Sequence, residues 1–148
     1  MTIFNNPVPG ASLVVQVSDV NPGVFTMTGF AGQAACLNQD ETINRPQNPA
    51  AAGCVVALFL TGLGSTSPQS TDSTLTSPSM PPLSLHVLAY AGGQPASVLY
   101  AGDAPELIEG GCKVNFALPS GVGTGMVPVY VAAGNVVSSQ GGVWIWVK

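Results

Sequence analysis

The chain has 148 residues, of which 46% are hydrophobic and 7% are charged, and its formal net charge is −4. Its cations are Arg45, Lys113 and Lys148 alone, which excludes the clustered positive charge that nucleic acids and polybasic membrane anchors require. The length suffices for one hydrophobic core, and the 18 glycines and 13 prolines favour many short strands joined by turns. We therefore predict a single all-β domain over residues 1–148.

Residues 1–20 are predicted to form an extended lead-in that ends in a strand. The strand is expected over Ser12–Val20, with Leu13, Val15 and Val17 on one face, because these apolar residues occupy alternate positions. The lead-in has neither a basic segment nor a continuous apolar stretch, so a signal peptide is not expected. The chain is therefore either cytosolic or a domain of a longer secreted protein.

The chain is organised around the apolar run from Gly53 to Gly64, which is closed at both ends by glycine. Its β-branched and aromatic residues favour a strand, and it is far shorter than the roughly 18 apolar residues that cross a bilayer. Before it, a small hairpin is predicted in which Gly32–Asn38 and Thr42–Asn44 flank the turn at residues 39–41. We predict a central strand buried on both faces, with its least accessible side chains at Val56, Leu58 and Phe59.

The segment 65–82 is rich in serine, threonine and proline and cannot bury an apolar face. It is predicted to be a long surface loop within one domain, because strands on both sides of it are needed for one core. A binding loop is the functional alternative. The later strands are expected at Leu83–Ala91, Ala96–Ala101, Cys112–Leu118, Met126–Ala132, Asn135–Ser139 and Gly142–Lys148.

The chain has three cysteines, Cys36, Cys54 and Cys112, so at most one internal disulfide can form. Cys36 and Cys54 either pair across neighbouring strands or, like Cys112, remain thiols that pack as small apolar residues. Alternation in its strand points the Cys112 side chain inward. A zinc site would need four ligands, and with His86 as the single histidine none is predicted.

No catalytic group, metal site or cofactor is predicted from the remaining polar residues. A serine–histidine–aspartate arrangement would have to use His86, but the alternation of its strand places that side chain on the solvent face. Glu106 and Glu109 could form the acid pair of a glycosidase. With Asp103 nearby in the same loop, they are expected instead to form a solvated acidic patch or a weak calcium site.

The strongest functional signal is the last strand, where β-branched residues alternate with tryptophans. Period-two geometry puts Val143, Ile145 and Val147 on the core face and both tryptophans on the other. In an immunoglobulin-like sandwich this strand shares a sheet with two earlier strands, and exposed apolar patches mark interfaces. The alternatives are that the tryptophans point inward or that residues 1–20 cover them. The predicted outward aromatic face consists of Trp144, Trp146, Tyr130, Tyr90 and Leu88.

Three parts of the sequence together resemble a known family. They are Asn21–Thr26 followed by Gly32–Asp40; Asn48–Gly53 through Leu60–Gly64; and Gly93–Gly102 leading to Val114-Asn115 and Leu118-Pro119. The pattern is similar to the uncharacterised C-terminal domain of secreted proteins from Solibacter-type acidobacteria, which in turn resembles the immunoglobulin-like IPT/TIG sandwich. The resemblance covers approximately residues 20–148. It implies an immunoglobulin-like β-sandwich of antiparallel strands, at the cell surface or outside the cell, with no established activity.

The sequence departs from this family at several positions. The family usually has glycine at Glu41 and near Glu106, and more often an aromatic residue at Cys112. It tends to carry small or polar residues at Trp144 and Trp146, so the aromatic face is itself a departure from the family pattern.

We therefore expect a non-catalytic extracellular or cell-surface module that binds or assembles through its aromatic face. The expected partner is a protein, either a second copy or a neighbouring domain, because Leu88 beside Tyr90 supplies the apolar surroundings of a protein interface. The alternative is a carbohydrate-binding module that binds a polysaccharide by stacking sugar rings on Trp144 and Trp146. A hydrolase is a weaker third hypothesis.

Overall fold

The structure, a computed structural model, describes residues 2–5, 8–12, 14–67, 83–108, 110–138 and 141–148. Every regular element in these ranges is a β-strand, which confirms the predicted all-β class. Among the described residues there is no helix long and apolar enough to cross a membrane. In chain order the strands are β1 (Thr2–Asn5), β2 (Val8–Ser12), β3 (Gly23–Val24), β4 (Gly32–Gln33), β5 (Cys36–Leu37), β6 (Val55–Thr61), β7 (Val87–Ala91), β8 (Gln94–Asp103), β9 (Cys112–Ala117), β10 (Gly125–Ala133), β11 (Val136–Val137) and β12 (Val143–Val147).

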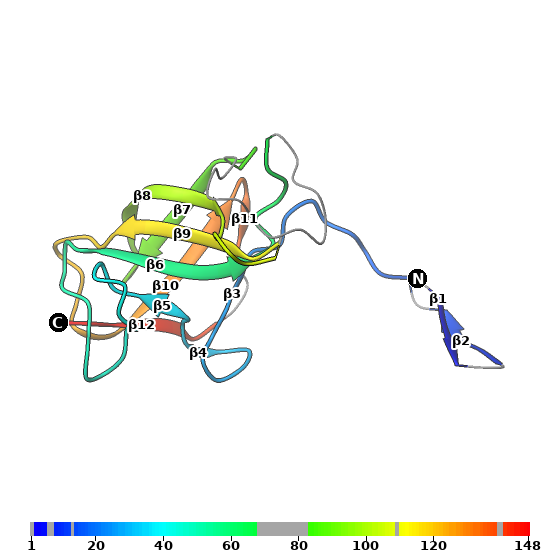
Figure 1. Ribbon diagram of the computed structural model, residues 1–148, viewed down its shortest axis with the longest axis horizontal. Helices are drawn as coiled ribbons and strands as arrows, with labels where there is room; N and C mark the ends of the chain where they lie inside the picture. The colour runs from blue at the N-terminus through cyan, green and yellow to red at the C-terminus, as the bar shows by residue number, and fades with distance from the viewer. Residues whose placement is uncertain (1, 6–7, 13, 68–82, 109, 139–140) are drawn as a thin grey trace.

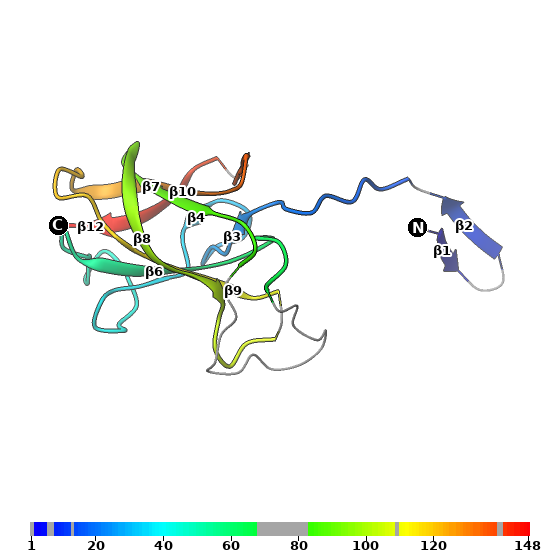
Figure 2. The ribbon, with the colours of Figure 1, turned by 90° about the horizontal axis from the view of Figure 1, so that it is seen from above.

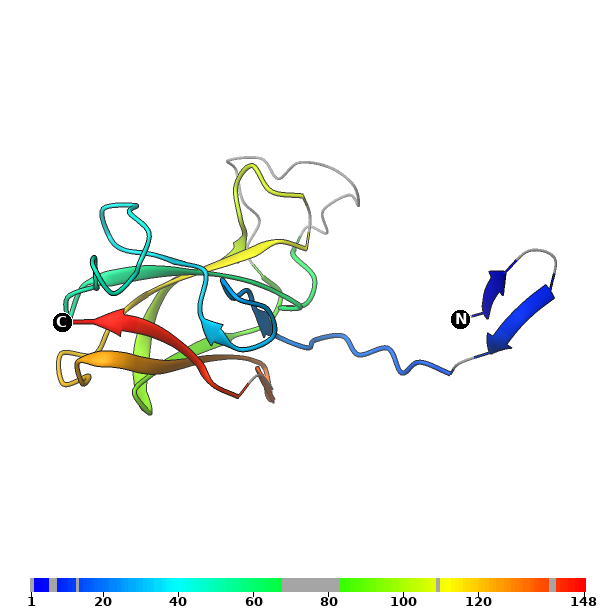
Figure 3. The same ribbon diagram turned by 90° about the horizontal axis from the view of Figure 1, so that it is seen from below.

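Strands β3 to β12 form a single curled sheet of 10 strands, in the order β3-β6-β9-β8-β7-β10-β12-β4, with β5 paired to β6 and β11 to β10. The neighbours are antiparallel except β12 and β4, which run parallel. Because the sheet curls, β6 and β9 lie on one side of the core and β10 and β12 on the other (Figure 1, Figure 2 and Figure 3). Strands β1 and β2 pair with each other in a separate sheet.

The sheet changes direction within β8. The first residues of β8 pair with β7, where Ala96 lies opposite Ala89, and the later residues pair with β9. Between Val98 and Tyr100 the register with β9 shifts, which is the signature of a β-bulge, and bulges bend the strand that contains them. Strand β8 therefore carries the chain from one side of the core to the other.

The segment that contains β3, β4 and β5 joins the two ends of the sheet. Strands β3 and β5 pair with β6, whereas β4, which lies between them in the chain, pairs with β12. The Ala34 amide donates to the Trp144 carbonyl at 2.8 Å. The carbonyl of the next residue, Ala35, accepts a hydrogen bond from the Phe59 amide at 3.1 Å. Adjacent residues are thus hydrogen-bonded to β12 on one side of the core and to β6 on the other, so this segment connects the two ends of the curled sheet.

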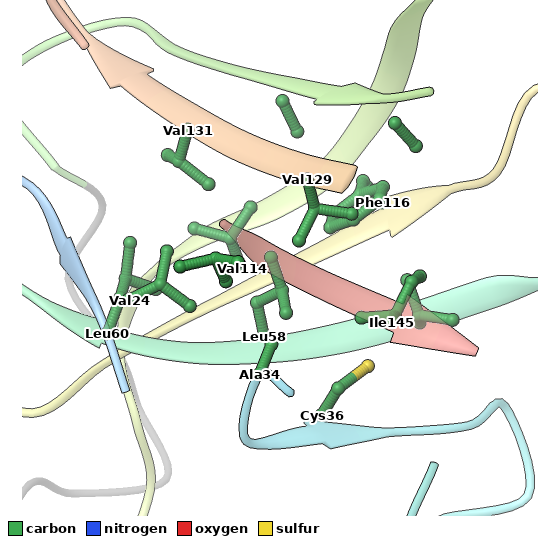
Figure 4. Packing of buried hydrophobic residues seen from close by; sticks show 14 of the residues in the cluster. Val24, Ala34, Cys36, Leu58, Leu60, Val114, Phe116, Val129, Val131 and Ile145 are labelled. Carbon is green, nitrogen blue, oxygen red and sulfur yellow. The ribbon is translucent and has the colours of Figure 1, made fainter. Parts of the chain in front are cut away.

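The core lies inside the curl and is built from alternate residues of each strand. In β6, Val56, Leu58 and Leu60 are buried, whereas Phe59 is half-buried. The predicted central strand is confirmed, but the prediction that both of its faces are buried, with Phe59 inaccessible, is wrong. Phe59 points to the outer side of an antiparallel sheet, which is partly open to solvent. Figure 4 shows the inner cluster, which includes Val24, Leu58, Leu60, Val114, Phe116, Val129, Val131 and Ile145.

The predicted strand over Ser12–Val20 is wrong for most of its length. Strand β2 ends at the first residue of this range, Leu13 lies outside the described residues, and Val14, Val15 and Val17 are 91, 55 and 96% exposed. Alternating valines form a strand only beside a partner that accepts their backbone hydrogen bonds. The edges of β6 and β12 are already taken by β3, β4 and β5.

Most of the other predicted elements are present with changed boundaries, but the predicted Gly32–Asn38 strand is divided into β4 and β5, and β7 begins at Val87, four residues after its predicted start. The hairpin about residues 39–41 is closed by a hydrogen bond from the Asn38 amide to the Thr42 carbonyl at 2.8 Å. Strand β8 extends beyond the predicted end, to Asp103. Of the predicted surface loop, residues 68–82 lie outside the described part of the chain.

Candidate interaction face

Strands β7, β10 and β12 are neighbours in the sheet, and they bring together the residues predicted for the aromatic face. Tyr130 lies opposite Tyr90, and Trp144 lies opposite Pro128. The β-branched residues of β12 are buried in the core, so the tryptophans lie on the outer side of the sheet. We define the aromatic face by the outward side chains of these three strands, Leu88, Tyr90, Met126, Pro128, Tyr130, Trp144 and Trp146.

Tyr90 and Tyr130 form a rigid pair on this face. They are partners in the β7–β10 ladder, and their rings stack with centroids 4.6 Å apart and planes inclined by 12°. A cross-strand aromatic pair of this kind contributes about 0.5–1.5 kcal/mol beyond the area that it buries. The stack also holds both rings in place, so their outer surfaces form a fixed part of the face.

Trp146 is held through both its side chain and its backbone. Its indole Nε1–H donates to Gln33 Oε1 on β4 at 3.2 Å. Its amide donates to Asn44 Oδ1 at 2.7 Å, and Asn44 Nδ2 donates to the Trp146 carbonyl at 2.8 Å. Sequence reasoning misses Gln33 and Asn44, because Asn44 lies 102 residues from Trp146 in the chain and no local pattern links the two.

Trp144 lies against β4. Gly32 is paired with Val143 in the parallel β12–β4 ladder, and a Cβ atom placed on Gly32 would lie 3.8 Å from Cη2 of Trp144. The Nε1 atom of Trp144 is buried without a hydrogen-bond partner among the described residues. Both tryptophans are half-buried, and the ring of each lies beside β4. They do not point into the core, and residues 14–19 are exposed and do not cover them.

The aromatic face carries no charge. Strands β7, β10 and β12 contain no aspartate, glutamate, lysine or arginine. Met126 and Leu88 are 60 and 41% exposed, and Pro128 is exposed as well. Sequence reasoning misses Met126 and Pro128, although the alternation of β10 that turns Tyr130 outward could have identified both. The face is a neutral, largely apolar surface.

Of the two alternatives for Cys36 and Cys54, the structure has the thiols and not the disulfide, because all three cysteines are free. In the β5–β6 ladder Cys36 lies opposite Leu58, four positions beyond Cys54. At about 3.3 Å per residue the two cysteines are roughly 13 Å apart along the strand, whereas a disulfide needs Cα atoms within about 7 Å. Burial raises the pKa of Cys36 to about 12 and the pKa of Cys112 to about 11. Both thiols are therefore protonated and unreactive at neutral pH.

The groups considered for catalysis and metal binding are not assembled. His86 is exposed, and within the described part of the chain its side chain makes no hydrogen bond to a serine or a carboxylate. Glu106 is exposed, but Asp103 is 4% exposed, so the predicted solvated patch is wrong for Asp103. Glu109 lies outside the described residues. The described residues contain no group of three or more potential metal ligands.

Fold and face together define a small all-β module with one neutral, partly aromatic surface on its sheet. Comparisons of the chain with models of protein families, with curated proteins and with solved structures gave no match. The function therefore has to follow from the geometry of this face.

Proposed function

We propose that this chain is a non-catalytic interaction module that binds or assembles through its aromatic face. The observation that carries the proposal is the absence of charge across three adjacent strands whose outward side chains are mainly aromatic or large and apolar. Neutral apolar surfaces of this kind are typical of interfaces, because a free surface of the same kind lowers solubility. The exposed and isolated position of His86, the single histidine, supports a role without catalysis.

We infer an immunoglobulin-like sandwich as the architecture of the module. Immunoglobulin-like folds place strands A, B, E and D in one sheet and strands C, F and G in the other. The order β3-β6-β9-β8 corresponds to the first sheet, and the order β7-β10-β12 corresponds to the second. The bulge in β8, between its pairings with β7 and β9, supports a chain that crosses from one sheet to the other.

The proposed partner is a protein, and the proposed location is the cell surface or the extracellular space. The partner class is supported by exposure: Met126 and Leu88 are well exposed, whereas Trp144 and Trp146 are half-buried. A sugar-binding platform needs exposed flat rings surrounded by polar groups. The location is supported by the resemblance of the sequence to domains of secreted proteins.

Two matched double variants test the role of the face. Leu88→Glu with Met126→Glu places two charges on the aromatic face. Leu99→Glu with Ile108→Glu adds the same charge at residues elsewhere that are 62 and 67% exposed. Sedimentation velocity measures association of the chain with itself and with candidate partner proteins, and circular dichroism verifies folding. We expect loss of association in the first variant only; loss in the second variant alone would locate the interface elsewhere.

The second candidate is a carbohydrate-binding module. The observation that favours it is that Trp144 and Trp146 lie two positions apart on the same side of β12. Co-sedimentation with insoluble polysaccharides tests this candidate. A sugar platform predicts that Trp144→Ser with Trp146→Ser abolishes binding more completely than Leu88→Glu with Met126→Glu. Equal retention of both variants by the polysaccharide would contradict it.

A further inference from the structure

We propose that the aromatic face is occupied by a second copy of this chain, packed face to face in a two-fold symmetric dimer. This inference rests on the proposed function and names the partner of the same surface. It is carried by the distribution of charge and by the shape of the face, and the area of the face indicates how strong the dimer is.

The absence of charge on the aromatic face limits which partner surfaces can bind to it. A charged group buried against this face would lose its hydration without gaining a counter-charge, which is costly. The partner must therefore bring a neutral surface, and the chain itself supplies one. Two copies that each carry a net charge of −4 can meet here without bringing like charges into contact. The described charged residues all lie outside β7, β10 and β12: Asp19, Asp40, Glu41, Arg45, Asp103, Glu106, Lys113 and Lys148.

The shape of the face suits a flat partner. Its aromatic side chains are half-buried, so they project less into solvent than fully exposed rings would. The stacked rings of Tyr90 and Tyr130 keep this surface fixed. Met126 and Leu88 are more exposed and can fit between the side chains of a facing sheet, as side chains do where two sheets pack about 10 Å apart.

The area of the face indicates a reversible dimer. Strand β10 has 9 residues and β7 and β12 have 5 each, so at about 3.4 Å per residue and about 4.8 Å between strands the three strands cover roughly 310 Å². The 2 residues of β4 raise this footprint to roughly 340 Å² per copy. The pair would then bury about 700 Å², which is typical of a weak, transient contact and lies below the roughly 1,200 Å² of a stable interface. We therefore expect a dimer whose population depends on the concentration of the chain.

The two-fold arrangement predicts which residues approach their own counterparts. Strand β10 is the middle strand of the face, so an axis through the centre of the face brings the β10 strands of the two copies together. Pro128 is exposed and lies near the middle of β10. A cysteine at this position would therefore lie close to the same cysteine of the second copy.

Sedimentation velocity over a wide range of chain concentrations tests the stoichiometry. We expect the mass to rise from monomer to dimer and to stop there. Leu88→Glu with Met126→Glu should weaken the dimer by about tenfold or more, because like charges then face each other across the axis. The control, Leu99→Glu with Ile108→Glu, should leave the dimer unchanged. A chain that is monomeric at every concentration, or that grows beyond a dimer, overturns the inference.

Disulfide trapping tests the orientation of the two copies. Cys54→Ser removes the cysteine that is not buried. In this background Pro128→Cys should give a disulfide-linked dimer under mild oxidation, whereas Leu99→Cys should not. Equal trapping at both positions would overturn the face-to-face arrangement.

The failure of this inference can be told apart from failure of the proposed function. If the chain is monomeric but Leu88→Glu with Met126→Glu abolishes its binding to a defined protein or polysaccharide, then the dimer alone is wrong. If a dimer forms and the same variant leaves it intact, then the dimer uses another surface and this inference is wrong; the proposed function is also wrong if that variant keeps its binding to every partner protein of the chain.

Discussion

The side chain of Asn44 takes the place of a neighbouring strand beside Trp146. Its Oδ1 accepts the Trp146 amide at 2.7 Å and its Nδ2 donates to the Trp146 carbonyl at 2.8 Å. Asn44 is fully buried, and its backbone oxygen accepts a hydrogen bond from the side chain of Gln33, which also receives the indole N–H of Trp146. The segment after β5 therefore orients one ring of the aromatic face.

We predict that Asn44→Ala destabilises the protein by about 2–4 kcal/mol. The change leaves the Trp146 amide without its acceptor and Asn38 Oδ1 without its donor. The Trp146 carbonyl keeps its bond from the Ala50 amide at 2.9 Å, which limits the loss. Unfolding in urea measures the effect. Asn135→Ala, in the exposed turn between β10 and β11, is the control and should change stability little; an equal loss in both variants would contradict the role of Asn44.

We predict that Leu58→Ala destabilises the protein more than Phe59→Ala, although phenylalanine is the larger residue. Leu58 is 0% exposed and belongs to the core, so its truncation leaves a cavity and should cost about 2–5 kcal/mol. Phe59 is half-buried on the outer side of β6, opposite Lys113, and leaves no internal cavity. Denaturant midpoints of the two variants measure the difference. A larger loss for Phe59→Ala would mean that the two faces of β6 are reversed.

The comparison of β6 and β12 shows what the sequence can predict about this fold. In β12 two residue types alternate, so the core face follows from the pattern alone. In β6 both faces are apolar, and a run without polar residues carries no information on which face is outside. The sequence therefore predicts the strand but not the orientation of Phe59.

At the candidate site, too, some features follow from the sequence pattern and others do not. Alternation together with strand order predicts that Tyr90, Tyr130 and the two tryptophans share a face. The contacts of Asn44 and the distance between Cys36 and Cys54 depend on which residues of distant strands lie opposite one another. Register of this kind is set by the packing of the whole sheet, so a single sequence does not reveal it.

We predict that Glu41→Gly and Glu106→Gly each stabilise the protein by up to about 1 kcal/mol. Both glutamates have a positive φ, 63° and 65°, in the left-handed region where a side chain costs about 1–2 kcal/mol and glycine does not. Thermal unfolding measures the gain. Alanine at the same positions also removes the charge but keeps the strain, so equal gains with alanine would show that charge, not backbone conformation, is responsible.

We predict three free thiols that differ in reactivity. Cys54 is partly exposed, whereas Cys36 and Cys112 are buried. A thiol reagent should therefore modify Cys54 quickly in the native protein and the other two only after unfolding. Cys54→Ser should remove the fast phase. An oxidised, denatured sample with a single free thiol would contradict the assignment and restore the disulfide.

We predict that the protein loses stability at alkaline pH. Burial raises the pKa of Cys36 from 9.0 to about 12 and the pKa of Cys112 from 9.0 to about 11. The folded state therefore keeps both protons at a pH where the unfolded chain has released them. The stability that each thiol contributes is fully present below pH 9, the pKa of a thiol in the unfolded chain. It is lost as the pH rises from there through the pKa of that thiol in the folded state. Between these limits the free energy of unfolding should fall by about 1.4 kcal/mol per pH unit for each thiol.

Urea unfolding at several pH values between 8 and 11 measures this slope, and cysteine variants assign it. Cys112→Ala should reduce the slope by about 1.4 kcal/mol per pH unit, the contribution of one thiol. This holds even if the variant is less stable at neutral pH because the truncation leaves a small cavity. Burial also raises the pKa of Tyr100 to about 12, so some decline above pH 10 should remain in every variant. A slope that is the same with and without Cys112 would contradict a buried, protonated thiol at that position.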